Sequence, residues 1–206
     1  MKVILYTGGL DSFIGLWLLR KQTDGEWVPV YFDTRLDYTW KEKQSFADNR
    51  REGERIRIIY DILDLTTLQA TGDGDPYIPQ RNTLLCTAVQ AVYDGAVTDI
   101  ALCSVADDIY RDNGTAFHRR MSDLLSITAG YEVRVFTPLV AGPGATLPIT
   151  KEEAIQKYLE LGGDAKALRK TVSCYDSRMV SCGRCKACER HLEALRTIGP
   201  VSSPSA

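Results

Sequence analysis

The stretch Lys2-Val-Ile-Leu-Tyr6-Thr7-Gly8-Gly9-Leu10-Asp11-Ser12 passes from an apolar run through two glycines into a segment whose apolar residues have helical spacing. This order predicts a strand, a tight turn and a helix that begins near Asp11. Glycines let the backbone approach an anion closely, and the amides at a helix start carry favourable partial charge. We therefore expect the turn to bind phosphate, with the hydroxyls of Thr7 and Ser12 as further donors. The alternative is a plain turn in which Asp11 only favours the start of the helix.

The alternation of strand and helix continues along the chain. Further strand-like apolar runs occur at 27–32, 57–62, 99–104 and 132–136. Helical patterns lie between them at 38–55, 82–96 and 116–126. Together they predict an α/β fold: a Rossmann-like, mostly parallel five-stranded sheet with helices on both faces. Ligands of such sheets gather at the carboxyl ends of the strands, so the segments of interest are 7–12, 33–38, 71–82 and 104–115.

The pattern changes after Pro138. Thr150-Lys-Glu-Glu153 predicts a capping box that begins a helix ending near Leu161, and 186–196 predicts a short final helix. We expect three parts: an α/β domain at 1–140, a small helical and cysteine-rich region at 141–198, and a mobile tail at 199–206.

Four of the six cysteines crowd into the pattern Cys174-x7-Cys182-x2-Cys185-x2-Cys188. Four thiolates suit a tetrahedral zinc ion, and the two short steps supply the tight turns that direct sulfurs to one centre. With no open coordination position, the zinc is expected to be structural, one ion per chain. A redox pair or an iron–sulfur cluster remains an alternative. The other two cysteines, Cys86 and Cys103, lie in apolar runs and are expected in the core.

Composition narrows the class of protein. The 206 residues are 44% hydrophobic and 25% charged, with a formal net charge of −2, so we expect no stable nucleic-acid partner. No apolar run approaches the roughly 18 to 20 residues of a membrane span, and the start of the chain does not fit a signal peptide. Cytoplasmic location is the expectation, and a homodimer stays open.

Two common nucleotide-binding motifs and the nucleophile motif of hydrolases are missing. The chain lacks the Walker pattern Gly-x-x-x-x-Gly-Lys-[Ser/Thr], as well as Gly-x-Gly-x-x-Gly and Gly-x-Ser-x-Gly. Instead, Thr7-Gly-Gly-Leu-Asp-Ser12 resembles the pyrophosphate loop of the N-type ATP pyrophosphatases, in the adenine nucleotide alpha-hydrolase-like superfamily. The resemblance implies that ATP is split to AMP and pyrophosphate while a carboxylate or carbonyl oxygen is adenylylated.

Two further motifs narrow the resemblance. Pro79-Gln-Arg81-Asn82 and Thr171-x-Ser-Cys174-Tyr175, with the cysteines that follow, resemble the 7-cyano-7-deazaguanine synthase family. Tyr110-Arg-Asp112 and Phe117 keep the spacing of another motif of that family. The resemblance implies an AMP-forming ligase that converts 7-carboxy-7-deazaguanine and ammonia to the nitrile, with ATP, Mg²⁺ and structural Zn²⁺.

The resemblance also assigns residues. The nucleotide would be held by Thr7, Gly8, Gly9, Leu10, Asp11, Ser12, Arg81 and Asn82. Ser12, Asp11 and Arg81 are the expected catalytic residues, with Asp11 serving the loop or Mg²⁺ through water. Arg81 could hold phosphate bidentately or form a structural ion pair. The guanine-like edge would meet Asp107, Asp108, Tyr110 and Asp112. His118 has no expected partner, and His191 is expected at the surface or beside the zinc site.

The chain departs from the family pattern near the expected cleft. Asp33-Thr-Arg35 and Ile109-Tyr-Arg-Asp replace Tyr-Gly-Gln and Gly-Tyr-Pro-Asp. A related enzyme that stops at the amide, or joins the deazaguanine to a protein, therefore stays open. A tRNA-sulfurating relative would need a catalytic cysteine, for which only Cys86 and Cys103 are available. A non-catalytic zinc-binding module would leave the glycine turn without a role.

Overall fold

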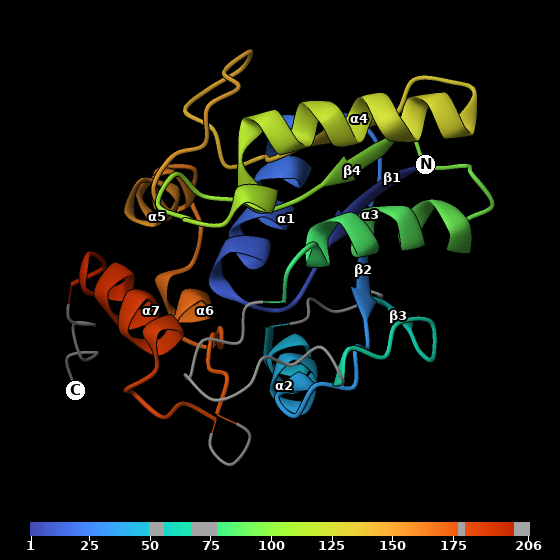
Figure 1. Ribbon diagram of the computed structural model, residues 1–206. Coiled ribbons are helices and arrows are strands. Elements are labelled where there is room, and N and C mark those ends of the chain that lie inside the picture. The colour runs from blue at the N-terminus through green and yellow to red at the C-terminus, as the bar shows by residue number, and fades with distance from the viewer. Residues whose placement is uncertain (50–55, 67–77, 177–179, 200–206) are drawn as a thin grey trace.

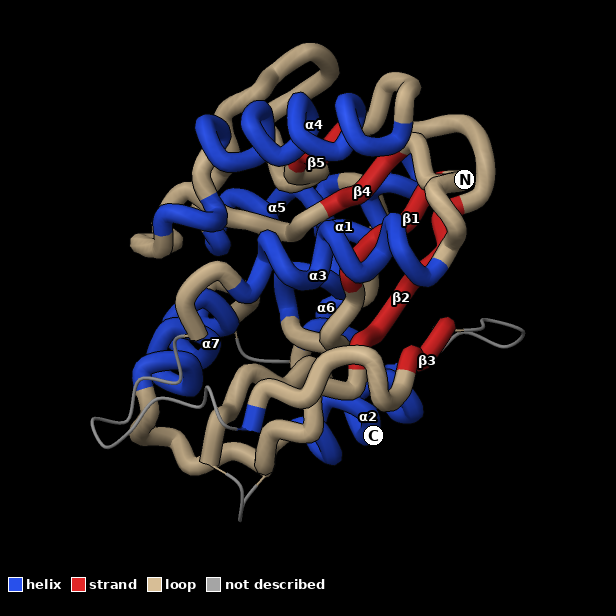
Figure 2. The backbone as a smooth tube through the Cα atoms, turned by 45° about the vertical axis from the view of Figure 1, so that its right-hand side comes forward, coloured by secondary structure: helices blue, strands red, loops and turns tan. Residues whose placement is uncertain are grey.

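The computed structural model describes residues 1–49, 56–66, 78–176 and 180–199. Within them the chain forms a parallel sheet of five strands in the order β3-β2-β1-β4-β5. The strands are β1 (Lys2–Leu5), β2 (Trp27–Phe32), β3 (Arg57–Ile59), β4 (Asp99–Ala101) and β5 (Arg134–Phe136). Figure 2 shows them side by side. The predicted fold class is confirmed.

The helices of the described residues fill the connections between strands and then form the C-terminal part. They are α1 (Leu10–Gln22), α2 (Thr39–Asn49), α3 (Arg81–Val92), α4 (Thr115–Ala129), α5 (Lys151–Glu160), α6 (Ala165–Leu168) and α7 (Lys186–Arg196). A 3-10 turn, η2 (Arg111–Asn113), precedes α4. The predicted capping box of α5 is confirmed, because Thr150 accepts from the Glu153 amide and the Glu153 side chain accepts from the Thr150 amide.

Some predicted bounds were wrong. We expected strands at 57–62 and 99–104, but β3 ends at Ile59 and β4 at Ala101. Asp61 adopts a left-handed conformation with φ of 61°, which an extended strand cannot include. The expected helix at 38–55 ends within the described residues at Asn49, and its predicted continuation over 50–55 lies outside them. The expected tail over 200–206 also lies outside the described residues.

Alternate strand residues pack against different helices, as the two-residue period of a strand requires. Val3 and Leu5 of β1 join a cluster with α3 and α4, whereas Ile4 and Tyr6 join α1 and α2 on the other face. Figure 1 shows α3 and α4 in front of the sheet and α1 behind it. Apolar side chains on both faces explain why the strands have nearly continuous apolar sequences.

The C-terminal helices extend the layer behind the sheet. Trp17 of α1 packs edge-on against Tyr158 of α5, with ring centroids 4.8 Å apart. Leu168 of α6 and Leu195 of α7 belong to the same buried cluster. The predicted helical region after residue 140 therefore shares a core with α1, while its boundary remains a prediction. Among the described helices, none combines the length and apolar character that crossing a membrane requires.

The strand order places a topological switch point beside β1. From β1 the chain proceeds to β2 on one side, and after β3 it returns to β4 on the other side. Loops leaving the carboxyl ends of such neighbouring strands diverge and open a crevice between them. Gly15 brings α1 close to this edge, because a Cβ at that position would lie only 2.4 Å from the Cys103 Sγ.

Candidate functional site

A cavity of about 400 Å³ lies at the carboxyl ends of β1, β2 and β4. Its wall includes the glycine turn after β1, the start of α3 and the loop after β4, as the strand order predicts. Residues from the cysteine region close another side, through the segment 172–175 and the first turns of α7. The site is therefore built from both ends of the chain.

The glycine turn is held by its own hydroxyl groups. Ser12 donates from Oγ to the Gly9 carbonyl at 3.1 Å and accepts from the Thr7 amide at 3.2 Å. The Gly9 amide in turn points to the Thr7 Oγ1 at 3.4 Å. Gly9 caps α1, whose first residue, Leu10, is fully buried. The first amides of a helix have no intrahelical acceptor, so α1 presents donors at this end of the cavity.

Gly8 is required by the neighbouring helix. Its φ of 72° is left-handed, and a Cβ there would lie 2.7 Å from the Phe46 ring and 3.1 Å from the Glu42 carbonyl. Ser45 donates to the Gly8 carbonyl at 2.6 Å. The turn is thus clamped against α2, and a larger residue would displace it.

Asp11 has a cationic partner that sequence reasoning missed. Lys151, the first residue of α5, donates from Nζ to both Asp11 carboxylate oxygens at 2.8 and 2.6 Å. The Lys151 side chain is 9% exposed and that of Asp11 27%. The pair joins the first turn of α1 to the start of α5. In the sequence, Lys151 appears only as a lysine directly after the capping Thr150. No neighbouring residue indicates that its partner is Asp11.

Arg81 lies at the start of α3 among hydroxyl groups. It lies beside the Tyr38 hydroxyl, and the Tyr38 ring packs edge-on against that of Tyr175, with ring centroids 5.0 Å apart. Burial alone lowers the pKa of Arg81, but Tyr175, Tyr38 and Glu42 raise it above the ordinary value. Arg81 is therefore a fixed positive charge on the cavity wall, where phosphate or carboxylate can meet it.

Glu42 is a second residue that the sequence did not single out. It lines the cavity and accepts a hydrogen bond from the Tyr31 hydroxyl at 2.7 Å. Burial raises its pKa to about 7, although the Tyr31 bond and Arg81 oppose the shift. A carboxyl group that titrates near neutrality inside a cleft is typical of functional sites.

The expected substrate residue Asp112 faces another direction. It is 6% exposed, is absent from the described cavity wall, and accepts from the Asn82 amide at 3.2 Å. The Asn82 side chain donates to the Asp112 carbonyl at 2.9 Å. Asp112 thus neutralises the start of α3, while Asn82 ties that helix to η2.

Asp107 and Asp108 do lie on the cavity wall, as does Tyr110. Arg190 of α7 donates from Nη2 to the Asp107 Oδ2 at 3.1 Å and to the Asp108 Oδ1 at 3.2 Å. Burial raises the pKa of Asp108, and the charge of Asp11 adds to that effect. The loop after β4 is therefore an acidic surface held by Arg190, a residue that the sequence did not single out.

Both histidines are buried. His118 lies within hydrogen-bond distance of the Ser104 hydroxyl at 3.2 Å, and burial lowers its pKa to about 4. Of the two positions expected for His191, the surface one was wrong, since the residue is 9% exposed; it lies on α7, one turn after Cys188. Burial and the charge of Lys151 lower the pKa of His191 to about 4. The apolar face of α7 packs on α5, which turns His191 inward.

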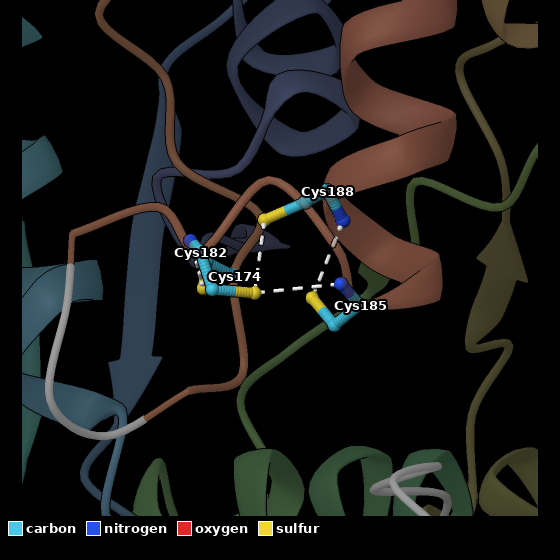
Figure 3. A group of neighbouring side chains, drawn as sticks. All are labelled: Cys174, Cys182, Cys185 and Cys188. Atoms are coloured by element: carbon cyan, nitrogen blue, oxygen red, sulfur yellow. Dashed lines mark hydrogen bonds between the residues drawn. The ribbon is translucent and has the colours of Figure 1, made fainter.

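The four clustered cysteines converge, as Figure 3 shows. The Sγ atoms of Cys174, Cys182, Cys185 and Cys188 all lie within 4.8 Å of one another. A tetrahedral zinc site with Zn–S distances of about 2.3 Å places its sulfurs about 3.8 Å apart. The Sγ atoms of Cys182 and Cys188 are 4.0 Å apart. The Cys185 amide donates to the Cys182 Sγ at 3.4 Å. Amides of Arg184 and Cys185 lower the pKa of Cys182 to about 6, which suits a thiolate ligand.

The cysteine cluster touches the cavity through a buried lysine. Lys41 of α2 is 1% exposed and donates to the Cys174 carbonyl at 3.3 Å and its Sγ at 3.4 Å. Tyr175 follows Cys174 directly and lines the cavity. A metal at the cluster would therefore fix two sides of the cavity wall, although its thiolates offer no open position for chemistry.

Fold and site together define an α/β class of protein with a parallel five-stranded sheet and a candidate four-cysteine metal site near the C-terminus. A model of the family described as "Queuosine biosynthesis protein QueC" matches residues 64–199. The chain belongs to this family.

Three relatives cover almost the whole chain. A protein of a Nitratiruptor species named 7-cyano-7-deazaguanine synthase is 27% identical, over 96% of this chain and 94% of its own length. Proteins of the same name are 27% identical in a Geobacter species and 22% identical in Psychromonas ingrahamii. They cover 98% and 96% of this chain, and 95% and 93% of their own lengths.

Proposed function

We propose that this protein converts 7-carboxy-7-deazaguanine and ammonia to 7-cyano-7-deazaguanine, with ATP as the activating substrate. One observation carries the proposal: the glycine turn, Arg81 and the Cys174-Tyr175 segment line the same cavity. The names of the relatives supply the product, 7-cyano-7-deazaguanine. The proposal is further supported by the cavity wall, which carries the glycine turn, the basic residue Arg81 and the aromatic residues Tyr38 and Tyr175.

The chemistry has to make a carboxylate electrophilic. Attack of its oxygen on the α-phosphorus of ATP gives an acyl adenylate and pyrophosphate, and ammonia then displaces AMP to give the amide. A second adenylylation at the amide oxygen, followed by elimination of AMP, gives the nitrile. These steps need positioning and charge neutralisation more than covalent help from the protein.

The residues of the turn have assigned roles. Amides of the α1 start, with the Ser12 and Thr7 hydroxyls, would bind the departing pyrophosphate. Lys151 holds Asp11 and with it the first turn of α1. Arg81 would neutralise phosphate charge as it grows, and Asn82 would act indirectly, by fixing the start of α3.

Magnesium would enter with the nucleotide and neutralise its phosphates. Asp11, Asp107 and Asp108 already bond to Lys151 or Arg190. Those carboxylates therefore offer a metal ion no vacant cage.

The deazapurine would lie at the acidic loop after β4. Asp107, Asp108 and Tyr110 line the cavity there. Each carboxylate oxygen can accept more than one hydrogen bond, so both aspartates can still accept from an amino group and a ring N–H. We now assign Asp112 to the support of α3, because its carboxylate turns to the Asn82 amide.

The alternatives differ in support. A sulfur-transferring enzyme would need a reactive cysteine near the cavity. Burial raises the pKa of Cys86 to about 12 and that of Cys103 well above its ordinary value, which leaves neither as a thiolate. An enzyme that stops at the amide, or joins the deazaguanine to a protein, would use the same cavity and differs in product.

Isotope transfer tests the proposed activation. Substrate labelled with ¹⁸O in its carboxylate should pass one label to AMP in each adenylylation, and ¹⁵N-ammonium should appear in the nitrile. Label that stays out of AMP would contradict adenylylation. A labelled amide that accumulates, or a mass increase of a protein, would replace the nitrile synthase by the corresponding alternative.

A further inference from the structure

Helix α7 begins inside the cysteine cluster. Cys185 caps the helix, and its Sγ accepts from the Cys188 amide at 3.4 Å. Cys188, in the first turn, is 2% exposed. Whatever fixes these two sulfurs therefore fixes the position and direction of the helix start.

Arg190 lies two residues after Cys188 and reaches away from the cluster into the cavity wall. Its Nη2 donates to the Asp107 carbonyl at 3.1 Å, to the Asp107 Oδ2 at 3.1 Å and to the Asp108 Oδ1 at 3.2 Å. One guanidinium thus holds both the backbone and the carboxylates of the loop after β4. Charge-assisted hydrogen bonds of this kind are stronger than neutral ones and set geometry.

The other oxygens of the two carboxylates are also engaged. The Asp107 Oδ1 accepts from the Lys151 amide at 3.2 Å, and the Asp108 Oδ2 accepts from the Asn113 side chain at 3.2 Å. These partners fix one end of each carboxylate, and Arg190 fixes the other. The negative charge of Asp11 disfavours the ionised form of Asp108, and the positive charge of Arg190 opposes this effect. Without Arg190, the ionised Asp108 would therefore be less stable.

We infer that Arg190 is a positioning residue through which the cysteine metal centre sets the geometry of the substrate-binding carboxylates Asp107 and Asp108. The inference rests on the proposed function, because it assigns those carboxylates to the deazapurine. The inference gives the metal centre a role in substrate affinity beyond holding the C-terminal region together. The connection between the metal centre and the two carboxylates runs through the Arg190 side chain, so it can be broken without changing a cysteine.

The first experiment separates substrate binding from nucleotide binding. Arg190→Ala should raise the KM for 7-carboxy-7-deazaguanine roughly 10-fold or more, because both carboxylates lose a charge-assisted bond. The KM for ATP should stay within about twofold, and the bound metal per chain should be unchanged. Arg190→Lys should recover part of the loss. The control is Arg196→Ala, which removes an exposed arginine from the last turn of the same helix.

The second experiment breaks the connection from the metal side. The acid is titrated calorimetrically into wild-type and Arg190→Ala proteins, with the metal bound and after chelation. Removal of the metal should strongly weaken binding of the acid to the wild type and should hardly change its binding to Arg190→Ala, because the effects of coupled perturbations are not additive. If chelation unfolds the chain, the kinetic comparison of the metal-loaded variants decides alone.

Three outcomes overturn the inference. They are an unchanged KM for the acid in Arg190→Ala, an equal rise of both KM values, and an equal further loss of affinity on chelation in both proteins. A wild-type enzyme that does not bind the acid overturns the proposed function, and the inference falls with it. A wild type that binds and turns over the acid beside an unaffected Arg190→Ala variant overturns only the inference.

Discussion

Lys151 and Asp11 form an ion pair that joins the first turns of α5 and α1, with Nζ 2.8 and 2.6 Å from the two carboxylate oxygens. The pair lies on the cavity wall beside the glycine turn. It ties the C-terminal region to the end of the sheet that carries the glycine turn. The geometry of the turn therefore depends on a residue 140 positions away in the chain.

Breaking this pair from one side should be costly. Lys151→Met leaves the Asp11 charge without its partner, and we expect a loss of about 1–3 kcal/mol in the free energy of unfolding. The double variant Asp11→Asn, Lys151→Met should regain much of that loss, because no uncompensated charge remains. Denaturant titrations measure both, with exposed Lys166→Ala as the control. Additive losses in the double variant would show that the two residues are not coupled.

Ser12→Ala should slow turnover more than it weakens ATP binding. In the structure the hydroxyl donates to the Gly9 carbonyl. We expect it to turn from that carbonyl to the phosphate charge that grows in the transition state, so its removal should cost on the order of 10- to 1000-fold in kcat. Thr128→Ala, at the far end of α4, should leave kcat unchanged. Steady-state assays of pyrophosphate release measure the effect. A Ser12→Ala enzyme with normal kcat would remove this hydroxyl from the mechanism.

The cysteine cluster should hold about one zinc ion per chain. Cys185→Ser should lose the metal and lower the melting temperature, because a closed thiolate site contributes directly to folding. Cys86→Ala changes a buried cysteine of the α3 core instead, and should keep the metal despite some loss of stability. Elemental analysis and thermal unfolding check both variants. Iron with visible absorbance, or a metal-free protein of normal stability, would contradict a structural zinc site.

Glu42 should make stability fall as the pH rises. Burial raises its pKa in the folded state to about 7, while the unfolded chain releases that proton near the ordinary value of 4.5. Between these two pKa values the folded state binds more protons than the unfolded state. Ionisation of Glu42 should therefore lower the free energy of unfolding by on the order of 1–3 kcal/mol by pH 8. Glu42→Gln cannot ionise and should lack this loss. The difference in unfolding free energy between the two proteins, measured at pH 5 and pH 8, should therefore change. A constant difference would mean that Glu42 is ionised throughout.

The features that the sequence predicted well are those determined by residues close together in the chain. The five parallel strands follow from apolar runs, and the glycine turn and cysteine cluster follow from spacings of a few residues. A strand–glycine–helix order leaves the turn few conformations, and short Cys-x2-Cys steps direct sulfurs to one point. For the same reason the capping box at Thr150 could be predicted with its partners.

The contacts that complete the site are long-range and could not be predicted. Lys151 looks like an ordinary helix-start residue, and Lys41 like one charge among many on an exposed helix. Their partners, Asp11 and Cys174, are brought to them only by packing of distant elements. Asp112 accepts from the first turn of α3, and a carboxylate beside the cleft can serve either a substrate or the start of a helix. Nothing in its local sequence distinguishes the two roles.

The central claim is the reaction itself, and one assay tests it most directly. Purified metal-loaded protein is incubated with 7-carboxy-7-deazaguanine, ammonium and ATP, and all products are identified by mass spectrometry. We predict 7-cyano-7-deazaguanine together with AMP and pyrophosphate. Release of ADP and phosphate, or ATP turnover without any nitrile, would contradict the account.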